Sequence, residues 1–95
     1  MAAYALINVD ITDSAGFAEY RKLAPATISA FGGRFLTRGG ATEVLEGEWI
    51  PSRLVILEFA DVAAIKAWYG SPEYRQLLEL RKRTAKSDFI VIDGG

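Results

Sequence analysis

Residues 53–60 have the sequence RLVILEFA, the strongest strand signal in this 95-residue chain. Its centre, LVIL, is aliphatic, rich in β-branched side chains and nearly unbroken by polar residues. Such a run is typical of a strand that lies inside a sheet and is covered by other elements. The fold is therefore read outward from this strand in both directions.

Downstream, the sequence predicts two helices and a final strand. Asp61 is placed to cap a short helix that Gly70 ends. The pair Ser71-Pro72 predicts an immediate restart, because serine caps helices and proline fits the first helical position. Residues 89–93 form the last predicted strand. One face of the second helix carries Tyr74, Leu77, Leu78 and Arg81.

Upstream, residues 4–11 alternate in polarity and predict the first strand. Residues 34–38 predict a second, short strand. Residues 42–46 are expected to continue it in extended form after a bend, and residues 47–52 to form a loop. The apolar face of the first strand consists of Ala5, Ile7, Val9 and Ile11.

A helix is predicted between these two strands. Asp13 or Ser14 is placed to cap it, and Gly32-Gly33 to end it. Pro25 lies inside the helix, so we expect a kink or a restart near residues 23–24. The apolar stripe at helical spacing consists of Phe17, Tyr20, Ala24, Ile28 and Phe31.

The predicted order of elements is therefore β-α-β-β-α-β. This order is typical of a ferredoxin-like α+β sandwich, with a four-stranded, mainly antiparallel sheet and helices on one face. Residues 1–95 are expected to form one domain, because their number suits a single hydrophobic core.

Composition excludes several classes of function. Apolar residues make up 51% of the chain, which indicates a packed core. The net charge of −1 argues against nucleic acids and anionic membranes as partners. The absence of cysteine and histidine excludes thiolate chemistry, imidazole metal ligands and a Ser-His-Asp triad. We therefore expect no metal and no cofactor.

Targeting patterns are also missing from the sequence. No apolar run approaches the roughly 20 residues that span a bilayer, and the N-terminus does not resemble a signal peptide. We expect a cytoplasmic protein with no membrane partner.

The sheet face that the helices leave open is expected to be strongly apolar. Leaving about six aliphatic side chains exposed there would forgo on the order of 10 kcal/mol. A second copy, packed sheet to sheet, is the simplest cover, so the sequence predicts a homodimer. The expected residues are Leu6, Leu36, Leu54 and Ile56, with either Ile90 and Ile92 or Phe89 and Val91.

Four longer segments give the chain a recognisable signature. They are GGRFLTRGG (32–40), VLEGEW (44–49), RLVILEF (53–59) and WYGSPEY (68–74). In this order they resemble the bacterial family of domain of unknown function 1330, within the dimeric α+β barrel superfamily. The resemblance spans essentially the whole chain.

That resemblance implies a ferredoxin-like subunit whose sheet packs on its twin's sheet to form a barrel. It implies no particular reaction, because the family has none assigned. Its wider relatives include cofactor-independent monooxygenases, lactone isomerases and haem enzymes. The histidine-ligated haem branch fits poorly, because this chain has no histidine.

Four polar residues, Asn8, Asp10, Arg38 and Glu58, interrupt the apolar pattern of the open face. If Asn8, Arg38 and Glu58 converge, they line a pocket inside the barrel. Glu58 is then the candidate catalytic base, Arg38 orients a carboxylate or enolate-like oxygen, and Asn8 supplies a neutral hydrogen bond. The alternative, given about equal weight, is that Arg38 and Glu58 form only an ion pair that fixes the register of the dimer.

The aromatic and basic residues have a structural interpretation beside a functional one. Tyr20, Trp68 and Tyr74 fall on helical stripes, so core packing is the first expectation and a ligand-binding wall the second. Trp49 lies in a loop, from which it can reach a dimer interface. The basic run at residues 81–83 is expected to complement the helix dipole from a solvated face.

Two classes of function follow from the sequence. The first is a small-molecule-binding dimer that acts as a cofactor-independent enzyme, isomerase-like or monooxygenase-like, in the barrel pocket. The alternative is a non-catalytic ligand-binding, sensing or structural module, and the choice between them stays open. RNA binding is set aside, because the third strand offers Leu54, Ile56 and Glu58 in place of exposed aromatics.

Overall fold

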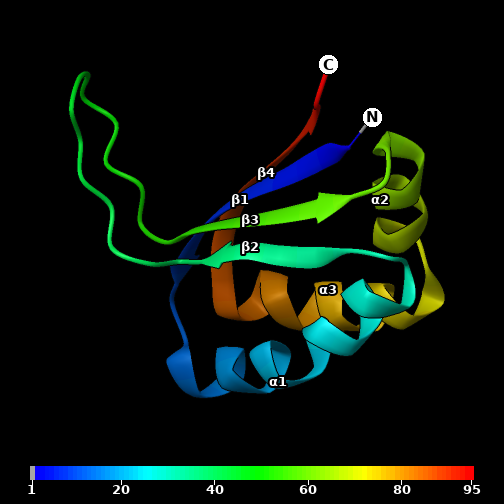
Figure 1. The fold of residues 1–95 in the computed structure, drawn as a ribbon. Coiled ribbons are helices and arrows are strands. Elements are labelled where there is room, and N and C mark those ends of the chain that lie inside the picture. Colours follow the sequence, from blue (N-terminus) through cyan, green and yellow to red (C-terminus); the bar gives the residue numbers. More distant parts are fainter. Residues whose placement is uncertain (1) are drawn as a thin grey trace.

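A computed structural model describes residues 2–95, which fold into one sheet with helices on one of its faces (Figure 1). No helix of this range is long and apolar enough to cross a membrane. The elements in chain order are β1 (Ala3–Ile11), α1 (Ser14–Ala30), β2 (Arg34–Arg38), β3 (Leu54–Phe59), α2 (Val62–Tyr69), α3 (Pro72–Thr84) and β4 (Ala85–Asp93).

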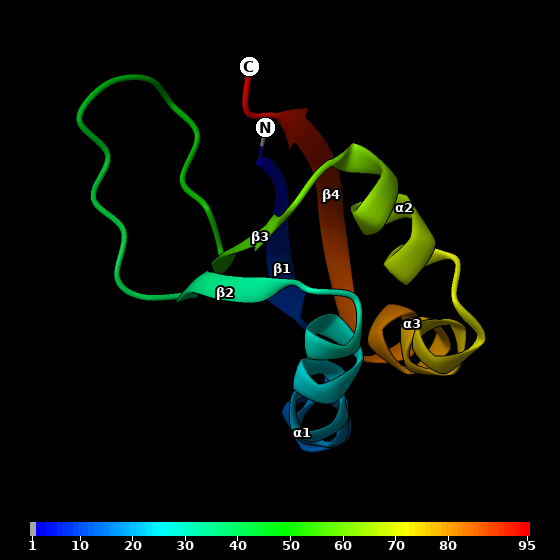
Figure 2. The same cartoon turned by 45° about the vertical axis from the view of Figure 1, so that its right-hand side comes forward.

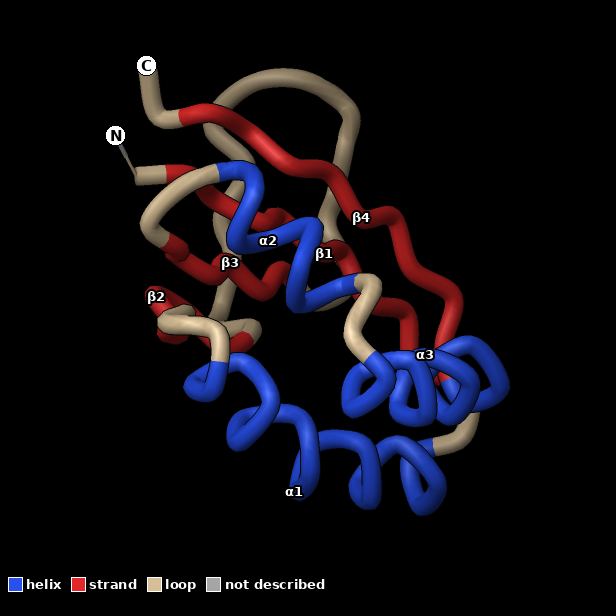
Figure 3. The backbone as a smooth tube through the Cα atoms, turned by 90° about the vertical axis from the view of Figure 1, so that its right-hand side faces the viewer, coloured by secondary structure: helices blue, strands red, loops and turns tan. Residues whose placement is uncertain are grey.

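The sheet has the order β2-β3-β1-β4, and every neighbouring pair is antiparallel. Helices α1 and α3 lie side by side, and α2 lies across the same face of the sheet (Figure 3). This arrangement confirms the ferredoxin-like α+β fold. The chain from Arg53 onward follows the prediction closely, except that β4 begins at Ala85 because it pairs along the whole of β1.

The helix caps follow from the sequence. The side chains of Asp13, Asp61 and Ser71 accept hydrogen bonds from the backbone N–H groups of the first turns of α1, α2 and α3. A kink or a restart was predicted near residues 23–24, and because helix α1 runs unbroken through Pro25 the restart is wrong. Proline removes one hydrogen bond, and the tertiary packing of the neighbouring turns holds the helix together.

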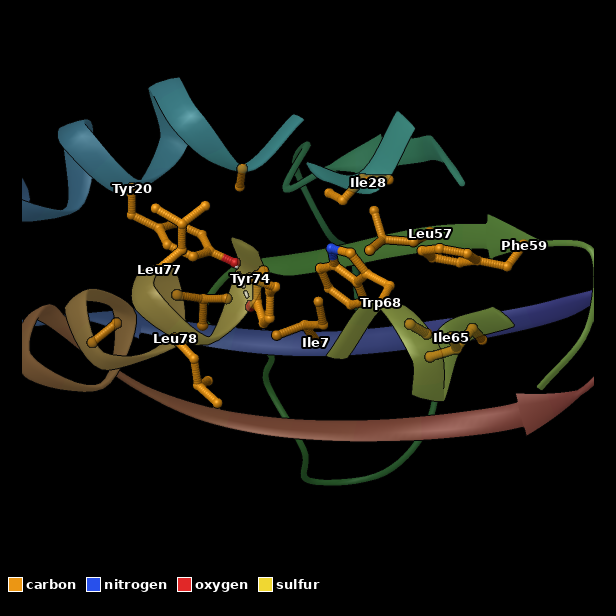
Figure 4. Close-up of a cluster of buried hydrophobic side chains, with 14 of the residues drawn as sticks. Ile7, Tyr20, Ile28, Leu57, Phe59, Ile65, Trp68, Tyr74, Leu77 and Leu78 are labelled. Atoms are coloured by element: carbon orange, nitrogen blue, oxygen red, sulfur yellow. Dashed lines mark hydrogen bonds between the residues drawn. The ribbon is translucent and has the colours of Figure 1, made fainter. Parts of the chain in front are cut away.

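The core lies between the helices and the face of β1 that carries Ala3, Ala5, Ile7 and Val9. Trp68 of α2, with 0% of its surface exposed, is at its centre. The centre of its ring lies 4.2 Å from the centre of the Tyr74 ring and 5.5 Å from that of the Phe59 ring (Figure 4).

The other sheet face is open and apolar. Leu6 lies opposite Ile56 on one side and Ile90 on the other, so these three side chains share that face. Ile90 is 57% exposed and Ile92 is 48% exposed. Of the two pairs weighed for β4, Ile90 and Ile92 therefore face away from the helices, whereas Phe89 packs against the core.

A long loop joins β2 to β3 and arches away from the sheet (Figure 2). Residues 42–46, predicted to be extended, form no strand, because β3 begins only at Leu54 and offers them no partner. Trp49 and Pro51 lie in this loop, as predicted. The large apolar side chains that the loop exposes are Val44, Leu45, Trp49 and Ile50.

Candidate functional site

A cavity lies between α1 and the three strands β2, β3 and β1 of the sheet. Its volume is about 70 Å³, and the empty space reaches about 590 Å³ when the open mouth is included. The enclosed part is smaller than a typical ligand pocket, so a ligand here would have to be compact and extend into the open mouth. The walls are mainly apolar and include Val9, Phe17, Ala24, Ile28, Phe35, Val55, Leu57 and Trp68.

Four arginines line the same cavity, namely Arg21, Arg38, Arg53 and Arg81. Arg38 is exposed and lies 3.9 Å from the centre of the Phe35 ring. Arg53 donates a hydrogen bond of 2.9 Å to the backbone oxygen of Arg38. Burial, followed by the charge of Arg21, lowers the pKa of Arg53. The mouth is therefore a concentration of positive charge.

Arg81 of α3 is the buried member of this group, with only 4% of its surface exposed. Its Nε atom is buried without a hydrogen-bond partner. Within residues 2–95 the one ion pair joins Arg34 to Glu58, so no carboxylate of the described chain neutralises Arg81. Its guanidinium lies 5.7 Å from the centre of the Phe89 ring. Leaving such a charge unpaired is costly in free energy.

Two tyrosines meet beside the cavity. The hydroxyl groups of Tyr20 on α1 and Tyr74 on α3 share a hydrogen bond of 2.7 Å (Figure 4). Burial raises the pKa of Tyr20, and the neighbouring Tyr74 raises it further. Burial also raises the pKa of Tyr74, against the opposing effect of the Arg81 charge. Both phenols therefore stay protonated, and one of the two protons forms the bond between them while the other is free to be donated.

These raised pKa values predict how stability depends on pH. Phenols in the unfolded chain ionise near pH 10, whereas Tyr20 and Tyr74 hold their protons longer in the fold. Their contribution is complete below about pH 10 and is lost as the pH rises further. Urea unfolding at pH 9 and pH 11 should show a fall in stability that shrinks in the double variant Tyr20→Phe/Tyr74→Phe. An equal fall in both proteins would contradict this assignment.

Three of the residues predicted for the site, Tyr20, Arg38 and Trp68, line the cavity, and a fourth, Tyr74, lies beside it. Tyr74 holds the Tyr20 hydroxyl from behind. Trp68 also donates a hydrogen bond of 3.1 Å from its indole nitrogen to the hydroxyl of Thr27. The three aromatic rings are in the core, so their packing role and their place beside the cavity coexist.

The expected meeting of Arg38 with Glu58 is wrong. The register of β2 shifts between Phe35 and Thr37, so Arg34 lies opposite Glu58 whereas Arg38 lies opposite Val55. This irregularity turns Arg38 to the helix side of the sheet, into the cavity mouth. Glu58 stays on the other face, where its Oε1 atom accepts a 2.7 Å hydrogen bond from Nε of Arg34.

Asn8 is also outside the cavity. Its side-chain oxygen accepts hydrogen bonds from the backbone N–H groups of Ser52 at 2.9 Å and Arg53 at 3.3 Å. Asn8 therefore fastens the end of the long loop to β1. Asn8, Arg38 and Glu58 therefore do not converge into the pocket expected on the open face. The cavity lies on the helix side of the sheet instead, and Arg38 is the one of the three that lines it.

Three lining residues, Arg21, Arg53 and Arg81, were missing from the predicted site. Arg81 had a visible signal, because it shares the buried face of α3 with Tyr74, Leu77 and Leu78. The solvated position predicted for the run at residues 81–83 holds for Lys82 and Arg83 and is wrong for Arg81. No group of three or more acidic side chains within residues 2–95 could hold a metal ion.

Comparison with known proteins agrees with this fold. The family model described as domain of unknown function (DUF1330) matches residues 2–95. No curated protein matches the chain. A protein of unknown function from Rhodopseudomonas palustris has 19% identity and a TM-score of 0.78, over 99% of this chain and 82% of that one.

Two further structures share the fold at lower identity. A dimeric ferredoxin-like protein of unknown function from Jannaschia has 12% identity and a TM-score of 0.72, over 98% of this chain and 99% of that one. SnoaB, a cofactor-independent oxygenase from Streptomyces nogalater, has 11% identity and a TM-score of 0.67, over 99% and 93%. At these identities the likeness concerns the fold alone.

Proposed function

The chain belongs to the DUF1330 family, and from that starting point we propose that it binds a small molecule in the cavity between α1 and the sheet. The observation that supports this best is the combination of apolar walls with a few convergent polar groups. Those groups are the Tyr20 hydroxyl and the guanidinium groups that line the cavity. Ligand sites of proteins are typically built in this way.

A metabolite screen on the isotope-labelled protein tests this proposal. Binding should shift the backbone amide resonances of residues around the cavity, such as Phe17, Ala24 and Val55. Resonances of the opposite sheet face, such as those of Leu6 and Ile56, should move less. Shifts confined to the open face, or none with any compound of a broad library, would contradict the proposal.

We also propose that the open face of the sheet joins two copies of the chain. The exposed Ile90 and Ile92 lie on this face together with Leu6 and Ile56. Apolar patches of this kind mark interfaces, and identical copies cover them most simply. Two similar structures, from Jannaschia and from Bacteroides fragilis, are described as dimeric proteins with a ferredoxin-like fold.

Catalysis without a cofactor is a second candidate function. It is favoured by the hydrogen-bonded pair of Tyr20 and Tyr74, because the phenol that accepts the shared hydrogen bond keeps its own proton to donate to an oxygen atom of a bound molecule. SnoaB, which shares the fold, is described as a cofactor-independent oxygenase. The role of base proposed for Glu58 gains no support, because Glu58 pairs with Arg34 outside the cavity.

Turnover of a compound found in the screen distinguishes the two candidates. Catalysis predicts that product forms and that the variant Tyr74→Phe lowers its rate while the compound still binds. Binding without any product, in the presence of air and over a range of pH, would leave a ligand-binding or sensing protein.

A further inference from the structure

Resting on the proposed binding in this cavity, we infer that the ligand is an anion, a carboxylate carried on a small apolar body. Arg81 is its counter-ion. The inference begins with the placement of this side chain on the buried face of α3, where it lines the cavity. An arginine cannot shed its charge by losing a proton at ordinary pH, so burial must be offset by a partner.

The protein itself supplies no such partner. Nε of Arg81 is a buried donor without an acceptor, and the ion pair within residues 2–95 is that of Arg34 with Glu58. The Phe89 ring and the Tyr20 and Tyr74 phenols lie close to Arg81, and although the Tyr74 hydroxyl interacts with the guanidinium, none of these groups carries a negative charge. A carboxylate suits the Arg81 guanidinium, because its two oxygens match the paired N–H groups of a guanidinium.

The other ionisable groups of the cavity select the same sign of charge. Arg21, Arg38 and Arg53 line it too, and the remaining ionisable side chain of the lining is the Tyr20 phenol. The chain has 12 acidic residues, and none of them lines the cavity. Positive charge gathered at one concave place attracts anions and repels cations.

The walls define the rest of the ligand. Phe17, Phe35 and Trp68, together with aliphatic side chains, leave few polar partners beyond the arginines and Tyr20. Polar substituents of a ligand would be buried there without hydrogen bonds, at a cost in affinity. The ligand that fits best carries a single acidic group and a compact apolar or aromatic body.

The probes for this inference are benzoate and its neutral counterpart benzamide, titrated by NMR into the 95-residue protein. Benzoate should bind at least about tenfold more tightly than benzamide, with shifts around the cavity. In the variant Arg81→Met, benzoate affinity should fall by about 30-fold or more, since losing one partner of a buried charge pair costs at least that factor. The matched control Arg83→Met removes the same charge from an exposed position on α3 and should change affinity less than about threefold.

Each outcome of this titration has a distinct meaning. Equal binding of benzoate and benzamide in the cavity would overturn the inference and leave the proposed binding function intact. Binding of inorganic phosphate as tight as that of benzoate would overturn the assignment of an apolar carboxylate. Failure of both aromatic probes would also overturn it, and the broad metabolite screen then decides the proposed function separately. The comparison of the two probes needs no variant, so it holds even if Arg81→Met folds poorly.

Discussion

Replacing Trp68 with alanine is expected to lower the free energy of unfolding by about 3–5 kcal/mol, the usual cost of deleting a large buried aromatic ring. Trp68 has no exposed surface, and its ring contacts those of Tyr74 and Phe59 at the centre of the core. The substitution also removes the indole donor from the Thr27 hydroxyl. A domain of this size typically has about 5–15 kcal/mol of stability in total, so the variant should be only marginally folded.

Urea denaturation followed by circular dichroism measures this loss. The control is Trp49→Ala, which removes the same side chain from the loop between β2 and β3, where it is 62% exposed. The control should stay within about 0.5 kcal/mol of the natural protein when both are measured at low concentration. A loss below about 1 kcal/mol for Trp68→Ala would contradict the central place of this ring.

The second large effect concerns the proposed homodimer. Ile90→Glu places a carboxylate on the open sheet face, next to Leu6 of β1. Two-fold symmetry brings the change into the interface twice, and each buried, unpaired charge costs several kcal/mol. We therefore expect the dimer dissociation constant to rise by about a thousandfold or more, which leaves a monomer at micromolar concentration.

Sedimentation velocity reads out this change directly. The control Leu23→Glu puts the same charge on the helix surface, at a position that is 45% exposed, and should leave the dimer intact. A natural protein that sediments as a monomer at tens of micromolar, or an Ile90→Glu variant that remains dimeric, would contradict the proposed interface.

Local signals in the sequence predicted the fold well. Asp13, Asp61 and Ser71 are caps whose short side chains bond the adjacent backbone, so their effect depends on neighbours in sequence alone. The alternation in β1 likewise determined which side chains the helices cover. These features need no knowledge of distant contacts.

The candidate site was harder to predict, because it depends on contacts between distant segments. The shift in register at Leu36 separates Arg34 from Arg38 by face, although the four-residue spacing of a regular strand would put them on the same side. Because of this single irregularity, the predicted pairing of Arg38 with Glu58 does not form. The role of Asn8 could not be predicted either, because the backbone N–H groups that bond to it, at residues 52–53, lie far along the chain at the end of the loop between β2 and β3.

Arg81 shows the limit of reading charge by local context. At the end of a helix, a run of three basic residues is usually solvated, and two of the three are exposed here. The periodicity of α3 places Arg81 with Tyr74 and Leu77 on the buried face, and this signal outweighs the charge run. The sequence feature that best indicated the site was therefore a charged residue at the helical spacing of the buried residues of α3.

A crystal structure of the protein soaked with a mixture of small carboxylates and neutral metabolites tests the central claim most directly. The account predicts electron density in the cavity between α1 and the sheet, with an oxygen of the ligand within hydrogen-bond distance of Arg81. Density between two packed sheets, beside Glu58 and Arg34, would contradict it. So would a cavity that stays closed by its own side chains in every soak.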